Sequence, residues 1–70
     1  MKSWKRTRKG ANQGEYMILD RETGEVVGDI GRVADRWWST HTAGGWWDFA
    51  ESFTEGADAV HARWLKSRAN

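Results

Sequence analysis

Short apolar runs bounded by turn residues predict two strands in the first half of the chain. One run is EYMILD, residues 15–20, and the other is EVVGDIG, residues 25–31. Between them, Gly24 can take the left-handed conformation of a bulged turn, and Asp20 can accept hydrogen bonds from the amides of that turn. The two runs are therefore predicted to form a β-hairpin.

The alternation of side chains along the second run indicates which of its faces is buried. Val26, Gly28 and Ile30 share one face, and Val27 points to the other. The face with Ile30 is the better candidate for the core. The glycines at positions 28 and 31 weaken a strand, and they indicate a bulge or a close contact with another element.

Two Trp-Trp doublets flank the polar, glycine-rich segment THTAGG, residues 40–45. If this segment is a turn, the doublets lie on neighbouring antiparallel strands, so that Trp38 pairs with Trp46 and Trp37 pairs with Trp47. Because side chains alternate between faces, each doublet sends one indole to each side of the sheet. One aromatic pair then packs in the core. The other pair is exposed, covered by the N-terminal segment, or buried against a partner.

The last third of the chain has the pattern of an amphipathic helix. Thr54 is a good N-cap, with Glu55 at the favourable end of the helix dipole, but Ser52 and Glu55 also match a capping box. The start of the helix is therefore defined only to within two residues. The apolar stripe with helical spacing consists of Ala57, Val60, His61, Trp64 and Leu65.

These elements predict a single α+β domain over residues 15–70, in which a three- or four-stranded antiparallel sheet packs one face on a C-terminal helix. Residues 1–14 are interpreted as a basic N-terminal arm, and the alternative is a first strand from Ser3 to Lys9. The predicted core consists of one Trp from each doublet together with Met17, Leu19, Ile30, Phe49, Phe53, Val60, Trp64 and Leu65.

The size and composition of the chain restrict how such a fold is stabilised. A domain of 70 residues buries a small core and usually needs a supplement. The sequence has no cysteine, so disulfides and thiolate metal sites are excluded. Six tryptophans provide bulky core residues, and oligomerisation is the remaining supplement. The sequence has no long apolar run, so we expect no membrane segment and a cytoplasmic location.

The net charge of +1 hides an uneven distribution of charge along the chain. The first ten residues contain five basic side chains, and no acidic residue precedes Glu15. Residues 15–62 contain all ten acidic side chains and three arginines, which gives −7, and three basic residues follow. Clustered Lys and Arg with one aromatic ring suit phosphate contact and base stacking. A nucleic-acid-binding N-terminal segment would use Lys2, Trp4, Lys5, Arg6, Arg8 and Lys9.

Nothing in the sequence assembles a catalytic acid, base and nucleophile. His61 is interpreted as a filler at the edge of the core and His41 as a surface turn residue. The carboxylates near the helix start are explained by helix capping and the dipole, and the glycines do not have the spacing of a phosphate-binding loop. We therefore expect no enzymatic activity, no cofactor, no metal ion and no small-molecule substrate.

An aromatic pair on the second face of the sheet favours a binding function. Tryptophan is enriched at interface hot spots, and contiguous exposed aromatic residues on a small protein mark a partner site. The predicted function is a small non-enzymatic binding or accessory protein that contacts a protein partner or a second copy of itself. Nucleic-acid binding through the N-terminal segment is the alternative. The residues assigned to the protein interface are Trp37, Trp38, Trp46 and Trp47.

The stretch WWDFAESFTEGADAVHARWL, residues 46–65, resembles small β-sheet-plus-helix proteins of unknown function from phages and actinomycetes. In these proteins a strand that ends in an aromatic residue precedes a helix entry of the form F-T-x-x-x-x-A, here Phe53, Thr54 and Ala59. Residues 15–66 are also slightly similar to the arm-binding domain of tyrosine recombinases, but they are acidic where that domain contacts DNA. The resemblance implies a fold of strands and one helix, and it implies no functional residues.

Overall fold

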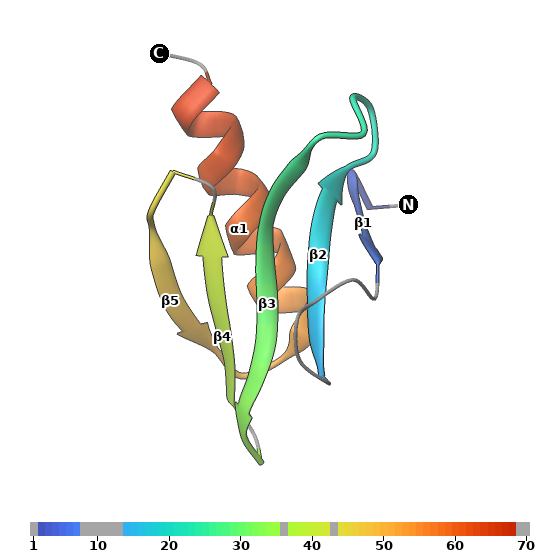
Figure 1. The fold of residues 1–70 in the computed structure, drawn as a ribbon. Coiled ribbons are helices and arrows are strands. Elements are labelled where there is room, and N and C mark those ends of the chain that lie inside the picture. Colours follow the sequence, from blue (N-terminus) through green and yellow to red (C-terminus); the bar gives the residue numbers. More distant parts are fainter. Residues whose placement is uncertain (1, 8–13, 36, 43, 69–70) are drawn as a thin grey trace.

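The computed structural model describes residues 2–7, 14–35, 37–42 and 44–68. One antiparallel sheet with the strand order β1-β2-β3-β4-β5 is covered on one face by a single C-terminal helix (Figure 1). The α+β class is confirmed, and the sheet has five strands rather than three or four. The elements are β1 (Trp4–Thr7), β2 (Glu15–Asp20), β3 (Val26–Ala34), β4 (Trp37–Thr42), β5 (Trp47–Ala50) and α1 (Phe53–Arg68).

The strand beyond those predicted for residues 15–70 is β1, and it comes from the basic N-terminal segment. Trp4–Thr7 forms β1 and pairs with β2, so that Trp4 lies opposite Asp20. The sequence allows either an arm or a first strand here, and over Trp4–Thr7 the structure has the strand. The buried indole of Trp4 explains the pairing, because it brings a large apolar side chain under the helix. Arg8 and Lys9 lie outside the described residues.

The β2–β3 hairpin has the predicted turn. Gly24 has a φ of 78°, and the Asp20 carboxylate accepts a hydrogen bond from the Thr23 amide at 2.8 Å. A register shift follows, because Leu19 pairs with Val26 whereas Ile18 pairs with Gly28. A β-bulge therefore leaves one extra residue on β3.

Because of the bulge, the side chains of this hairpin that face the core differ from those predicted. Val27 is fully buried and Val26 is exposed, whereas the simple alternation buried Val26. On β2, Ile18 is buried, while Met17 and Leu19 face away from the helix and are only partly covered. The prediction of Ile30 and Gly28 on the buried face is confirmed, and the prediction of Met17, Leu19 and Val26 there is wrong.

The tryptophan doublets do not pair as predicted. Trp38 lies opposite Ala50 and Trp47 lies opposite His41, so the turn is shorter than the assumed six residues. The Thr42 amide donates to the Trp46 carbonyl at 2.8 Å, and the Trp46 amide donates to the Thr42 hydroxyl at 3.1 Å. These bonds extend β4 through Thr42 and close the turn there, which offsets the doublets along the two strands.

Helix α1 begins with a cap at Ser52. The Ser52 hydroxyl accepts a hydrogen bond from the Glu55 amide at 3.1 Å, and its carbonyl accepts one from the Gly56 amide at 3.0 Å. Of the two N-caps that the sequence left open, Ser52 rather than Thr54 is therefore the one that the structure has. A serine one residue before the first helical residue satisfies an amide that otherwise has no partner in the first turn.

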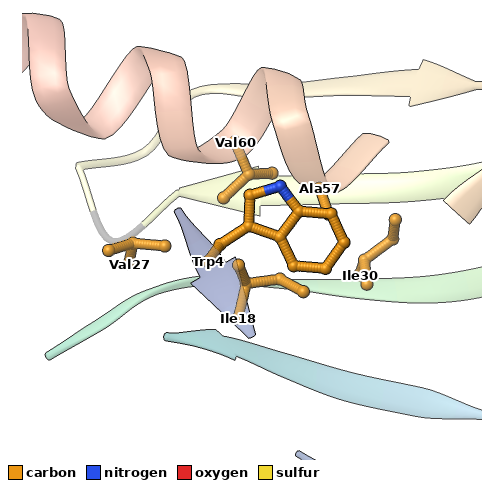
Figure 2. Packing of buried hydrophobic residues seen from close by; sticks show 6 residues of the cluster. All are labelled: Trp4, Ile18, Val27, Ile30, Ala57 and Val60. Atoms are coloured by element: carbon orange, nitrogen blue, oxygen red, sulfur yellow. The ribbon is translucent and has the colours of Figure 1, made fainter. Parts of the chain in front are cut away.

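The core lies between α1 and the sheet. In Figure 2, the Trp4 indole lies among aliphatic side chains from β2, β3 and α1. Gly56 lets the helix approach closely, since a Cβ at this position would lie 2.6 Å from Ile30 Cδ1 and 2.8 Å from Thr40 Cγ2. The buried apolar cluster consists of Trp4, Ile18, Val27, Ile30, Ala57 and Val60.

Two further predicted core residues are exposed. Phe49 lies opposite Ser39 on β4. Side chains alternate between the two faces of a strand, and the neighbouring Ala50 takes the buried position, so Phe49 points away from α1. Leu65 lies near the end of α1, where it is about half exposed beside Asp20 and Arg21. The predictions of Phe53, Val60 and Trp64 as core or core-packing residues are confirmed.

Candidate functional site

The face of the sheet that points away from α1, called the outer face below, carries a group of exposed apolar side chains. The aromatic patch is defined here as Val33, Trp37, Trp47 and Phe49, which are 56%, 40%, 57% and 52% exposed. Trp47 and Phe49 are two residues apart on β5 and share this face, and their rings meet edge to face at 5.4 Å. Contact between the two rings fixes them as one surface.

The aromatic patch surrounds a shallow hollow. Val33, Ala34, Trp37 and Phe49 line a cavity of about 300 Å³ that is open to solvent and almost entirely apolar. The hollow exists because a register shift between Arg32 and Ala34 turns the end of β3 where β4 begins. A bulge at this point aims Val33 and Trp37 toward β5 rather than along the strand. The site can accept an apolar side chain from another molecule.

Polar groups border the aromatic patch along the outer face. His41 lies opposite Trp47, and its Nδ1 is 3.3 Å from Asp29 Oδ1, with both side chains about half exposed. Asp29, Ser39 and His41 line a neighbouring polar depression together with Glu15 and Arg32. An apolar centre with a polar, solvent-accessible rim is the usual composition of a protein–protein interface.

The structure separates the four tryptophans that the sequence assigned to one interface. Trp37 and Trp47 lie in the aromatic patch, whereas Trp38 and Trp46 are partly buried and pack against the core on the helix side. The Trp38 ring is 5.3 Å from that of Phe53, and the Arg32 guanidinium lies 5.4 Å from the Trp38 ring. The prediction that each doublet sends one indole to each face is therefore confirmed.

The N-terminal basic set is also divided. The Trp4 indole donates to Asp58 Oδ1 at 2.6 Å, and Lys2 Nζ forms an ion pair with Asp58 Oδ2 at 3.1 Å. The hydrogen bond from Trp4 is the main cause that lowers the pKa of Asp58, and Lys2 adds to it. Buried in this way, Trp4 has no free ring face for stacking on a base.

Of the other residues in that set, two are described. The Arg6 guanidinium lies over the rings of Tyr16 and Phe53, at 5.0 Å and 5.5 Å from their centres. Lys5 is exposed and lies one position along β1 from Trp4, on the outer face. Lys5 and Arg6 nevertheless line one depression together with Lys2 and Arg21, whereas Arg8 and Lys9 lie outside the described residues.

Sequence reasoning missed a buried polar pair between β2 and α1. His61 Nε2 is 2.6 Å from Asp20 Oδ1, and both side chains are less than a tenth exposed. The hydrogen bond with His61 is the largest cause that lowers the pKa of Asp20, so the carboxylate accepts and the imidazole donates. The two residues are 41 positions apart, and the only local signal was a histidine on the apolar stripe of the helix.

In the part of the chain that the structure describes, no three His, Cys, Asp or Glu side chains come together as a group that could hold a metal ion. None of its helices has both the length and the apolar composition to cross a bilayer.

Comparisons with known proteins give no further assignment. No known protein family, no curated protein and no solved structure matches this chain. The resemblance to phage and actinomycete proteins and to recombinase arm-binding domains therefore stays a prediction. The aromatic patch is the feature of the described surface that most needs an explanation.

Proposed function

We propose that this domain is a small binding module whose aromatic patch contacts an apolar protein surface, either on another protein or on a second copy of the chain. The observation that carries the proposal is the exposure of Trp37, Trp47 and Phe49 on a face that none of the described elements covers. Large apolar side chains that are exposed together cost solubility and add nothing to the core, which favours a role outside the fold.

The energetics of association support the choice of a protein ligand. Burial of apolar surface contributes about 25 cal/mol per Å², and an aromatic side chain buries about 150–250 Å². Two tryptophans and a phenylalanine therefore supply the kind of central hot spot that dominates protein interfaces. The hollow beside Phe49 gives such a partner a place to insert one side chain.

The edge of the sheet gives a second reason. Strand β5 is the last strand in the order, and its sequence WDFA has no lysine or proline, so a pairing strand would have to displace only the Asp48 carboxylate, which accepts a hydrogen bond from the Phe49 amide at 2.8 Å. Trp47 and Phe49 lie on this strand, so the edge and the aromatic patch form one continuous surface. A partner that adds a strand to β5 would bury both.

Sedimentation velocity over a range of protein concentrations tests this function, with wild type compared to the double variant Trp47→Ala/Phe49→Ala. The matched control is Leu65→Ala, which removes an exposed apolar side chain from α1 instead. Self-association that the control retains and the double variant loses supports a second copy as the partner. Self-association that all three retain assigns the contact to another surface and contradicts the proposal.

If the wild type is monomeric, affinity capture with the same three proteins as baits tests a foreign partner. A protein retained by wild type and by Leu65→Ala but lost with Trp47→Ala/Phe49→Ala supports the proposal. Identical captured proteins from all three baits contradict it.

Phosphate contact through the N-terminal segment is the weaker candidate function. Lys5 remains exposed, but Trp4 is buried and Lys2 is paired with Asp58. Neutralisation of Lys5 should therefore leave nucleic-acid affinity unchanged, and an electrophoretic mobility shift measurement at low salt checks this.

A further inference from the structure

A second surface, distinct from the aromatic patch, lies on the helix side of the sheet. Residues from the end of α1, from the end of β4 and from the segment just before β5 line an open cleft of about 270 Å³. The cleft is called the basic cleft below, and its lining residues are Thr42, Gly44, Trp46, Arg63, Trp64, Lys66 and Ser67. None of these residues belongs to the aromatic patch.

The lining of the basic cleft combines indoles with positive charge. Of the side chains that the structure describes, Arg63 and Lys66 are the charged ones that line it, and no carboxylate of that part of the chain does so. The Arg63 guanidinium lies 5.2 Å from the Trp46 ring, and Arg68 lies 4.5 Å from the Trp64 ring on the same helix. Among the described residues, neither Arg63 nor Lys66 forms an ion pair. Their charge is therefore available to a ligand.

Helix stability accounts for only some of these positive charges. Basic residues in the last turn of a helix complement its dipole, which accounts for a positive charge at Lys66 and Arg68. That role needs no aromatic neighbour. Arg63 instead spans from α1 to Trp46, whose amide and carbonyl bond to Thr42 and whose side chain packs against the core.

We propose that the basic cleft binds a phosphate-bearing nucleobase, either a free nucleotide or one nucleotide of a single strand. The guanidinium of Arg63 and the ammonium of Lys66 bind the phosphate, and the base stacks against Trp46, because the Trp64 ring already lies beside His61 and Arg68. Arginine offers a planar pair of donors that matches phosphate oxygens, and every base has a face that stacks on an indole.

The size of the basic cleft limits the ligand to one nucleotide unit. Its volume of about 270 Å³ falls just below the range of about 300–1,000 Å³ that is typical of small-molecule sites. A duplex keeps its bases stacked inside and presents only phosphates, so it cannot use the indole of Trp46. Single-stranded or free nucleotides present both chemical groups at once.

The test is a titration of ¹⁵N-labelled protein followed by the indole Nε1 signals of its tryptophans. The probes are adenosine 5′-monophosphate, inorganic phosphate, a single-stranded oligodeoxyadenylate, and the duplex that this strand forms with oligothymidylate. We expect the monophosphate or the single strand to shift the signals of Trp46 and Trp64 and to leave those of Trp37 and Trp47 unchanged. Binding of the single strand alone, falling with salt, identifies a strand as the source, and binding of the monophosphate identifies a free nucleotide.

Matched variants assign the effect to the basic cleft. Arg63→Gln/Lys66→Gln should weaken binding about tenfold or more, because hydrogen bonds to charged groups are the stronger ones. Lys5→Gln removes an exposed positive charge on the opposite side of the sheet and should leave binding unchanged. Three results overturn the proposal: no shift with any probe, equal affinity for inorganic phosphate and the monophosphate, or a loss with Lys5→Gln that equals the loss with the double variant.

Discussion

The two faces of the sheet use the same residue type in opposite ways. On the helix side, the Trp38 and Trp46 rings each lie beside an arginine and pack against the core. On the outer face, Trp37 and Trp47 are exposed, and Trp47 meets Phe49 edge to face. The difference indicates that the first pair stabilises the fold, with Trp46 also lining the basic cleft, and that the second pair is available for association on the outer face.

The same contrast holds for the two His–Asp pairs. His61 and Asp20 lie between α1 and β2, nearly fully buried and 2.6 Å apart, whereas His41 and Asp29 lie on the outer face, half exposed and 3.3 Å apart. Buried pairs are sensitive to the loss of one partner, and exposed pairs contribute little. The helix side therefore carries the stability of the fold, and three matched pairs of substitutions test this division.

The largest effect is expected from Gly28→Ala on the helix side. A Cβ at this position would meet the backbone carbonyl of His41 and lie 2.7 Å from Val60 Cγ1, and backbone cannot move aside cheaply. We expect the free energy of unfolding to fall by about 3 kcal/mol. Urea denaturation followed by tryptophan fluorescence measures it. The control is Gly44→Ala, whose Cβ would have no neighbour closer than 3.9 Å, and an equal loss in both variants would contradict the account.

A smaller but clear loss is expected from Asp20→Asn. This change removes the carboxylate that accepts bonds from His61 and from the Thr23 amide. The matched change on the outer face, Asp29→Asn, removes the partner of His41. We expect Asp20→Asn to lower the urea midpoint several-fold more than Asp29→Asn does. Equal midpoints for the two variants would show that burial of the first pair has no energetic consequence.

The pH dependence of stability should follow the same carboxylates. The pKa of Asp20 and that of Asp58 are both lowered from the ordinary value of 3.8. A carboxyl whose pKa is lowered in the folded state stabilises the fold at pH values above its pKa in the unfolded chain. This contribution is lost as the pH falls through the pKa of the folded state. We expect stability to be maintained down to about pH 4 and to fall below it. Asp20→Asn should flatten this decline, and an unchanged acid profile would count against the role of the pair.

Several features of the fold were predicted from sequence because they depend on neighbours in the chain. The turn at Gly24 with Asp20 as acceptor, the capping box at Ser52, and the stripe from Ala57 to Trp64 all rest on spacings of a few residues. Local chemistry specifies such elements directly. The alternation of each Trp doublet between the two faces follows from strand geometry in the same way.

The errors concern register and contacts between distant residues. The bulge beside Val27 and the shorter turn at Thr42 each shift a strand, which moves side chains to the other face or to another partner. The Asp20–His61 pair and the Trp4–Asp58 bond join residues 41 and 54 positions apart. No spacing in the sequence encodes these contacts. The exposure of Phe49 and the division of the tryptophans both depend on register, so the candidate site was only half predicted.

The smallest effect on stability is expected on the outer face, and it tests the central claim that the aromatic patch is a surface for association rather than part of the core. The measurement is the free energy of unfolding of Trp47→Ala, compared with Trp38→Ala at the same low protein concentration. We expect Trp47→Ala to stay within about 0.5 kcal/mol of wild type, while Trp38→Ala, which removes a partly buried ring, loses about 2 kcal/mol. A loss in Trp47→Ala as large as that in Trp38→Ala would contradict the account, because the outer indole would then hold the fold together.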